Sequence, residues 1–285
     1  MPESSPLITV AALSERLGDP ALRIVDCRWY LGRPGEGRQA YDAGHIPGAI
    51  HLDVDSDLAA DPEIGPGRHP LPDVADFVRR LEAAGIGDEH LVVTYDDVGG
   101  WVAARLWWML DDLGHERVVV LDGGWPAWLA AGGAVSTDMP PFPPARLHVR
   151  DRWTRVIDLN GLRPRLGQVV LLDARGAARY RGETEPIDAY PGHIPTARSA
   201  PTDTNLAPSG AFLPASELAA RYAALGADGS AGHVVTSCGS GVSACHDALA
   251  MRIAGLPAPL LYPGSYSDWT RHGLPVATGA DPGTP

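Results

Sequence analysis

A single cysteine, Cys238, stands where a short apolar run gives way to a loop of small residues. The run is Val234–Thr236, the loop is 239–243 (GSGVS), and a helical pattern follows over 244–254. Backbone N–H groups and the positive end of a helix dipole converge at such a helix start, where they stabilise an anion. A thiolate held there is a nucleophile. The alternative is that Cys238 is a small buried hydrophobe, the usual role of an unpaired intracellular cysteine.

Composition limits the classes of function open to the chain. Its 285 residues carry a formal net charge of −12, which disfavours nucleic acid and anionic membranes as partners. No signal peptide is visible at the N-terminus, and no run approaches the roughly 18 apolar residues of a membrane span. Three cysteines do not make a disulfide framework, and the ten histidines show no metal-ligand spacing. We therefore expect a cytoplasmic protein with reduced thiols, no metal and no cofactor.

Four blocks of sequence recur in the same order, at an offset of about 140 to 148 residues. The pairs are 24–30 with 171–180, 40–58 with 189–206, 91–110 with 234–251, and 118–135 with 259–276. The second pair contains a G-H-I-P motif in each copy. Four prolines in 136–153 indicate a linker between the copies. The repeat predicts an N-terminal domain over 1–137, a linker over 138–153 and a C-terminal domain over 154–285.

Short β-branched runs alternate with helical patterns in each copy. The runs are Val92–Thr94, Val118–Leu121, Val169–Leu172 and Val234–Thr236, and the helical patterns include 74–85 and 214–226. This alternation predicts an α/β fold with a parallel sheet covered by helices. Ligands bind at the carboxyl ends of the strands in such sheets, and Cys238 stands at such an end.

The repeat provides an internal comparison for the cysteine. Aligning the strands of the third block sets Asp96 opposite Cys238 and Gly99 opposite Gly241. A buried thiol that serves only the fold is not readily replaced by a charge. The difference indicates that the second copy is catalytic and the first is non-catalytic.

These blocks together resemble the two-domain rhodanese-type sulfurtransferases. The resemblance rests on the D-x-R and D-C-R strand ends, the paired G-H-I-P motifs and the loop 238–244 (CGSGVSA), and it covers roughly residues 7–277. It implies tandem rhodanese-like domains, each a mainly parallel sheet flanked by helices. It also implies an enzyme that takes a sulfane sulfur from a small anionic donor as a persulfide on Cys238. The acceptor would be cyanide, a thiol or a thioredoxin-like protein.

The resemblance also assigns roles to the loop. Cys238 and Ser240 are expected to be catalytic, and the substrate-binding residues are expected to be Gly239, Gly241, Val242, Ser243 and Arg179. Gly-Ser directly after the cysteine is typical of members that use 3-mercaptopyruvate, whereas basic residues there are typical of thiosulfate users. Arg179, in 179-RYRG-182, matches an arginine that binds the donor carboxylate, an interaction suited to a planar guanidinium.

One feature of the sequence disfavours 3-mercaptopyruvate as the donor. A second arginine that follows shortly in the mercaptopyruvate type has no match in 183–190 (ETEPIDAY). We therefore favour 3-mercaptopyruvate slightly, with thiosulfate close behind. A solvated surface charge is the alternative role for Arg179, and Arg175 is expected to pair with Asp173.

His45, in the first G-H-I-P motif, matches a histidine proposed to relay protons with the loop serine and an acid. Glu36 is the nearest candidate for that acid. A role in the fold is the alternative, because His193 holds the same position in the second copy.

Two other functions were weighed. A cysteine phosphatase carries C-x5-R, and here Ala244 stands in the place of the arginine. A non-catalytic persulfide carrier or regulatory module is disfavoured by the intact loop around Cys238.

Overall fold

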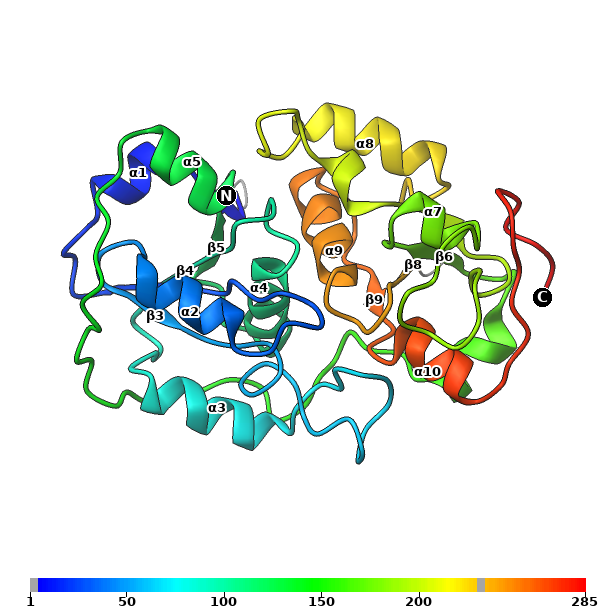
Figure 1. Ribbon diagram of the computed structural model, residues 1–285, viewed down its shortest axis with the longest axis horizontal. Helices are drawn as coiled ribbons and strands as arrows, with labels where there is room; N and C mark the ends of the chain where they lie inside the picture. The colour runs from blue at the N-terminus through cyan, green and yellow to red at the C-terminus, as the bar shows by residue number, and fades with distance from the viewer. Residues whose placement is uncertain (1–4, 230–233) are drawn as a thin grey trace. The chain divides into compact units, whose positions relative to one another are not determined.

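The computed structural model describes residues 5–229 and 234–285. Residues 1–4, which begin both the predicted N-terminal domain and the stretch searched for a signal peptide, lie outside the described residues. The chain divides into two compact units (Figure 1). Unit 1 comprises Met1–Ala60, Pro72–Thr154 and Pro208–Phe212, and unit 2 comprises Asp61–Leu71, Arg155–Ala207 and Leu213–Pro285. Each unit thus includes a short segment from the other half of the sequence.

Unit 1 is built on a parallel sheet with the strand order β1-β5-β4-β2-β3. Its strands are β1 (Leu7–Ile8), β2 (Leu22–Asp26), β3 (Ala49–His51), β4 (Leu91–Tyr95) and β5 (Val118–Leu121). Its helices are α1 (Val10–Ser14), α2 (Glu36–Ala43), α3 (Val74–Ala83), α4 (Ala103–Leu113) and α5 (Gly124–Ala130). The start of α3 is set by Asp73, whose side chain accepts hydrogen bonds from two N–H groups of the first turn.

Unit 2 repeats this plan on a parallel sheet with the order β7-β6-β8-β9. The strands are β6 (Val170–Asp173), β7 (Arg198–Ser199), β8 (Val234–Ser237) and β9 (Leu260–Leu261). The helices are α6 (Leu159–Leu162), α7 (Ala177–Tyr180), α8 (Ala215–Ala224), α9 (Ala244–Ile253) and α10 (Ser265–Arg271), with 3-10 turns η1 (Arg163–Arg165) and η2 (Thr202–Asn205). The prediction of an α/β fold with parallel sheets flanked by helices is confirmed.

The register of the second sheet brings two loops together. β8 lies between β6 and β9, and Asp173 pairs with Ser237 at the carboxyl ends of their strands. The N–H of Ala174 donates to the carbonyl of Ser237 at 2.9 Å, which continues the pairing by one residue. The residues after β6 therefore lie beside Cys238, the residue after β8, at the edge where parallel sheets bind ligands.

Both sheets are covered by apolar side chains of the flanking helices. The core of unit 1 includes Ile24, Val93 and Trp128, and that of unit 2 includes Leu171, Val235 and Trp269. In the described parts of the chain, no helix is both long and apolar enough to span a membrane.

Candidate active site

The loop that carries Cys238 is fixed by the start of α10. The N–H of Cys238 donates to Ser265 Oγ at 3.0 Å, and its carbonyl accepts from the N–H of Tyr266 at 2.9 Å. The carbonyl of Gly239 accepts from the N–H of Ser267 at 2.9 Å. These hydrogen bonds hold the backbone of Cys238 and Gly239 in place. The position of Cys238 Sγ is therefore set by the loop backbone and does not depend on contacts of the sulfur itself.

Gly241 supplies a hydrogen-bond donor to the sulfur. Its N–H lies 3.1 Å from Cys238 Sγ. Its φ is +78°, and a Cβ added there would lie 2.4 Å from the carbonyl oxygen of Pro263. Only glycine fits this left-handed conformation and this close approach. The loop therefore turns one N–H toward the sulfur, where it offers a hydrogen-bond donor to an anion held there.

The remaining loop residues close the turn into α9. Val242 and Ser240 are buried, and Ser243 precedes the first residue of the helix without a side-chain cap hydrogen bond. Ser240 Oγ lies 2.7 Å from Nδ1 of His69, with which it shares a hydrogen bond. His69 belongs to the segment Asp61–Leu71, which packs as part of unit 2.

The relay predicted for His45 does not match its contacts. Its ring nitrogens lie 2.8 Å from the carbonyl of Tyr41 and 3.1 Å from that of Asp138, and its ring stacks on Tyr41 at 3.9 Å. His193 makes the same hydrogen bond to the carbonyl of Tyr180 at 2.8 Å, with the rings stacked at 3.7 Å. The repeated histidine is therefore a fold element, and the histidine bonded to the loop serine is His69.

Two guanidinium groups lie beside Gly239, the residue that follows the cysteine. A Cβ added at Gly239 would lie 2.9 Å from Nη2 of Arg68 and 3.6 Å from Nη1 of Arg179. The structure thus brings Arg179 to the cysteine loop, as expected. A second arginine, Arg68, also lies there. It comes from the segment that carries His69, whereas the second arginine expected in 183–190 is absent from the sequence.

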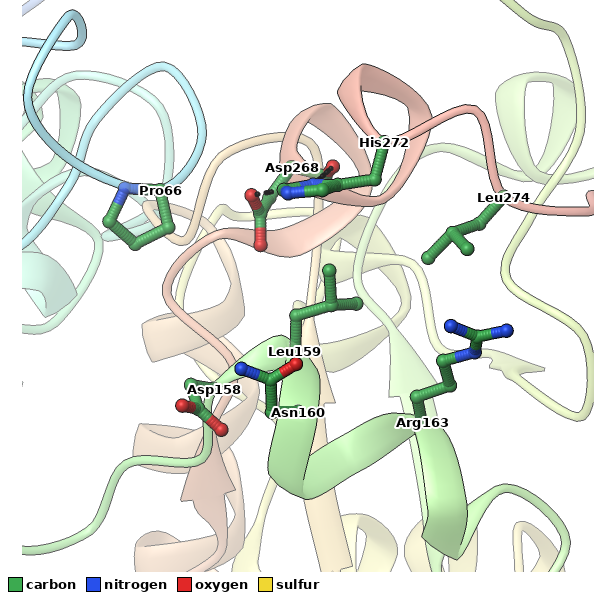
Figure 2. A pocket seen from close by; sticks show the side chains of 8 residues that line it. All are labelled: Pro66, Asp158, Leu159, Asn160, Arg163, Asp268, His272 and Leu274. Atoms are coloured by element: carbon green, nitrogen blue, oxygen red, sulfur yellow. Dashed lines mark hydrogen bonds and ion pairs between the residues drawn. The ribbon is translucent and has the colours of Figure 1, made fainter.

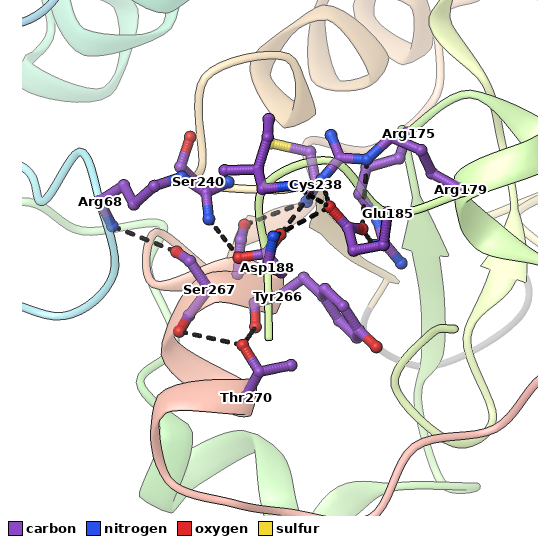
Figure 3. A network of polar contacts seen from close by, with 12 residues as sticks. Arg68, Arg175, Arg179, Glu185, Asp188, Cys238, Ser240, Tyr266, Ser267 and Thr270 are labelled. Carbon is purple, nitrogen blue, oxygen red and sulfur yellow. Dashed lines mark hydrogen bonds and ion pairs between the residues drawn. The ribbon is translucent and has the colours of Figure 1, made fainter. Parts of the chain in front are cut away.

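Both guanidinium groups are ion-paired with the same carboxylate (Figure 3). Asp188 pairs with Arg68 through Oδ1, and with Arg179 through Oδ2 at 3.1 Å. Glu185 also pairs with Arg179, at 2.7 Å. Burial acts to raise the pKa of Glu185, but the hydrogen bonds from Arg179 and from backbone N–H groups outweigh it and hold the pKa below its ordinary value. Glu185 is therefore ionised at neutral pH.

Arg175 forms the ion pair with Asp173 that was predicted from the sequence. Its Nε and Nη2 contact the two oxygens of Asp173, and Nη2 also donates to the carbonyl of Gly192 at 2.7 Å. Its guanidinium lies over the ring of Tyr266 at 3.8 Å. Burial acts to lower the pKa of Arg175, but the neighbouring carboxylates raise it above its ordinary value. This arginine links the end of β6 to α10, whose first residues hold the cysteine loop.

Sequence reasoning missed four residues of this cluster, namely Arg68, His69, Glu185 and Asp188. The segment 68-RHPLP-72 lies between two blocks of the repeat, so the self-comparison gave it no partner. An arginine and a histidine side by side among prolines were the available signal. Glu185 and Asp188 lie in 183–190, a stretch that was compared with the family for a second arginine and not for acids.

A cavity of about 470 Å³ lies elsewhere in unit 2 (Figure 2). It is lined by Pro66, Asp158, Leu159, Asn160, Arg163, Asp268, His272 and Leu274. Cys238 is not among these residues, and the cavity plays no part in the chemistry considered below. Within residues 5–229 and 234–285, no cluster of three or more His, Cys, Asp or Glu side chains is placed to hold a metal ion.

The corresponding loop of unit 1 directs four N–H donors at a single side chain. Asp96 directly follows β4, and its carboxylate is fully buried. Oδ1 accepts from the N–H groups of Val98 and Gly100, at 2.9 and 2.8 Å, and Oδ2 accepts from those of Val102 and Ala103, both at 2.8 Å. All four donors are N–H groups, so the ionised carboxylate is the form that satisfies them.

Both halves of the chain match a known family of domains. A family described as Rhodanese-like domain matches residues 9–131 and again residues 159–272. The chain is 44% identical over 281 residues to a probable 3-mercaptopyruvate sulfurtransferase of Pseudomonas aeruginosa, which covers 97% of this chain and 99% of that protein. It is 39% identical over 269 residues to a putative thiosulfate sulfurtransferase, SseB, of Mycobacterium tuberculosis, covering 93% of each. A solved 3-mercaptopyruvate sulfurtransferase from Leishmania major matches with a TM-score of 0.84 and 32% identity, over 95% of this chain and 75% of that one.

Proposed function

The chain is a sulfurtransferase that belongs to the rhodanese family, and we propose that it carries the transferred sulfur as a persulfide on Cys238. The observation that carries the proposal is the environment of Cys238 Sγ, which accepts an N–H hydrogen bond from Gly241 at 3.1 Å. The same loop lies against Arg68 and Arg179, which are the positive groups that an anionic donor requires. In unit 1 the same position is held by Asp96, which has no sulfur to offer.

The favoured donor is 3-mercaptopyruvate, with thiosulfate close behind. The thiolate of Cys238 attacks the donor sulfur, a new S–S bond forms, and the C–S bond breaks with its electron pair passing to the enolate of pyruvate. The enolate then takes up a proton, and the Ser240 hydroxyl bonded to His69 is placed to deliver it. With thiosulfate the leaving group is sulfite, and no proton is needed.

The guanidinium pair binds the negative end of the donor in both cases. A carboxylate or a sulfonate oxygen accepts hydrogen bonds from planar Arg groups, and two such groups hold it in one orientation. In the second half-reaction a thiol, cyanide or a thioredoxin-like protein attacks the outer sulfur. That step returns Cys238 to the thiolate, so the cycle requires no metal or redox cofactor.

The test is the mass of the protein after a single loading with donor. Wild-type protein treated with 3-mercaptopyruvate, or in parallel with thiosulfate, is expected to gain one sulfur atom on the peptide that contains Cys238. Cys238→Ser is expected to gain none and to lose turnover by at least about a thousandfold, because the nucleophile is removed.

Cys27→Ala is the matched control. Cys27 is buried in unit 1, and burial, together with the charges of Asp26 and Asp96, raises the pKa of its thiol well above its ordinary value. It therefore stays protonated and inert. A Cys27→Ala protein should load sulfur like the wild type. Absence of loading with both donors in the wild type would overturn the proposed function.

A further inference from the structure

Asp188 occupies an unusual place among the charges next to the cysteine loop (Figure 3). Its side chain is 3% exposed, and its two oxygens pair with two different arginines, Arg68 and Arg179. Those arginines are the groups nearest to Gly239, the residue after the cysteine. The carboxylate therefore stands where it neutralises the positive groups that a donor anion must use.

The charges of the whole cluster balance. The three guanidiniums are those of Arg68, Arg175 and Arg179, and the three carboxylates are those of Asp173, Glu185 and Asp188. Asp173 and Glu185 both pair with Arg175, which is 3% exposed and lies deeper than the others. Asp188 is the carboxylate that bridges the two arginines beside the loop.

Arg68 retains hydrogen-bonding capacity after this pairing. Its Nε–H is buried and has no hydrogen-bond partner among the described residues. Its backbone N–H donates to Ser267 Oγ at 3.1 Å, which fixes the chain at this point but leaves the guanidinium to be directed by Asp188. A buried donor without an acceptor is costly, and an anion beside Gly239 would relieve that cost.

We propose that Asp188 sets the charge selectivity of the donor site, by partly cancelling Arg68 and Arg179 so that a singly charged donor competes well with a doubly charged one. The attraction between the site and a donor scales with the product of their charges. Removing one negative charge from the site therefore strengthens the binding of a dianion more than that of a monocarboxylate. Asp188 acts through the arginines, so it is a positioning residue. The inference rests on the proposed function, because it assumes that the donor binds beside Cys238.

The test measures binding separately from sulfur transfer. Cys238→Ser protein, which cannot be loaded, is titrated calorimetrically with 3-mercaptopyruvate and with thiosulfate, with and without Asp188→Asn. We expect the added substitution to lower the dissociation constant about tenfold for 3-mercaptopyruvate and about a hundredfold for thiosulfate, allowing for partial exposure of the arginines. In the otherwise wild-type enzyme, Asp188→Asn should lower KM more for thiosulfate than for 3-mercaptopyruvate, and it should affect kcat less than KM.

Two variants serve as controls. Asp188→Glu keeps the charge and should leave the ratio of the two dissociation constants near that of the parent. Glu183→Gln removes one negative charge two residues before Glu185 in the sequence. Glu183 lies in an exposed ion pair with Arg181 that solvent screens, so this change should alter neither dissociation constant appreciably. Asp188→Ser removes the charge with a smaller side chain, should the amide variant fail to fold.

The outcomes separate the inference from the proposed function. Unchanged or weaker binding of both donors in Asp188→Asn, or an equal gain in Glu183→Gln, would overturn the role of Asp188 while leaving sulfur loading on Cys238 intact. Failure of the wild-type protein to load sulfur would instead remove the proposed function itself. A hundredfold gain for thiosulfate beside a tenfold gain for 3-mercaptopyruvate supports both.

Discussion

The loop after β4 and the loop after β8 hold the same place in their sheets, but they satisfy their backbone in different ways. In unit 1 four N–H groups converge on the carboxylate of Asp96. In unit 2 the corresponding residue is Cys238, whose sulfur accepts from Gly241 at 3.1 Å. Both loops thus direct backbone N–H groups toward the residue that follows the strand, four in unit 1 and one in unit 2, and the chemistry depends on that residue. A built-in carboxylate makes the first loop a structural element, whereas the proposed thiolate makes the second a reactive site.

The largest expected effect concerns the stability of unit 1. Asp96→Ala removes the acceptor of four buried N–H groups, so we expect it to lower the free energy of unfolding by about 3 to 5 kcal/mol. Cys238→Ala removes one weak acceptor, and its cost should be about 1 kcal/mol. All the tryptophans except Trp269 belong to unit 1, so tryptophan fluorescence in a urea titration follows that unit.

The control for that experiment keeps part of the acceptor. Asp96→Asn retains one carbonyl oxygen but turns an NH2 group toward two N–H donors, and should fall between the wild type and Asp96→Ala. If Asp96→Ala cost no more than Cys238→Ala, the carboxylate would not be what holds the first loop. The difference between the two loops would then need another explanation.

The next effect separates the two histidines. His69→Ala removes the hydrogen-bond partner of Ser240 and should lower kcat for 3-mercaptopyruvate by about 10- to 100-fold, because proton delivery to the enolate is impaired. The loss should be smaller with thiosulfate, since sulfite leaves without a proton. His45→Ala should instead lower the stability of unit 1 by about 2 kcal/mol, through lost hydrogen bonds and stacking.

Steady-state kinetics with both donors measure the activity of the two variants, and urea titrations measure their stability. Equal losses with the two donors in His69→Ala would show that the histidine positions the loop and does not deliver a proton. A kinetic defect in His45→Ala without loss of stability would restore the relay first predicted for it.

The sequence predicted those parts of the fold and of the site that depend on residues close together in the chain. The strand ends, the Cys238 loop and the Arg175–Asp173 pair are all set by residues within a few positions of each other, and the repeat supplied a second copy for comparison. The arrangement of Arg68 and His69 was not accessible in this way. Their segment, Asp61–Leu71, comes from the first half of the chain but packs with unit 2, and no periodicity or cap records that choice.

The role of His45 was left open by the sequence for a related reason. A histidine in a motif indicates both a relay and a fold role with equal force, because the imidazole serves either purpose. The decision came from Tyr41 and Tyr180, whose rings stack on His45 and His193 in the same way in both units. Neither tyrosine belongs to the G-H-I-P motif, so the motif alone did not decide between the relay and packing.

The last comparison concerns the helices that follow the two loops. In the repeat alignment that sets Asp96 opposite Cys238, Arg105 of α4 stands opposite Asp247 of α9, and both are fully buried. Asp247 accepts hydrogen bonds from Asn205 at 2.9 Å and from Tyr222 at 3.1 Å. Burial raises the pKa of its carboxyl from 3.8 to about 7, although these hydrogen bonds oppose the shift. Unit 2 therefore contains a buried acid where unit 1 has a buried arginine.

The sign of the resulting pH dependence follows from proton binding. Between about pH 4 and pH 7 the folded protein keeps the proton on Asp247 whereas the unfolded chain has released it, so stability falls as the pH rises through this range. The slope from this one group is at most about 1.4 kcal/mol per pH unit, and it vanishes above about pH 7. Urea unfolding followed by circular dichroism should show this slope as the difference between wild type and Asp247→Asn. Parallel pH profiles for the two proteins would mean that Asp247 stays ionised in the fold, and that α9 tolerates a buried carboxylate at the position where α4 has Arg105.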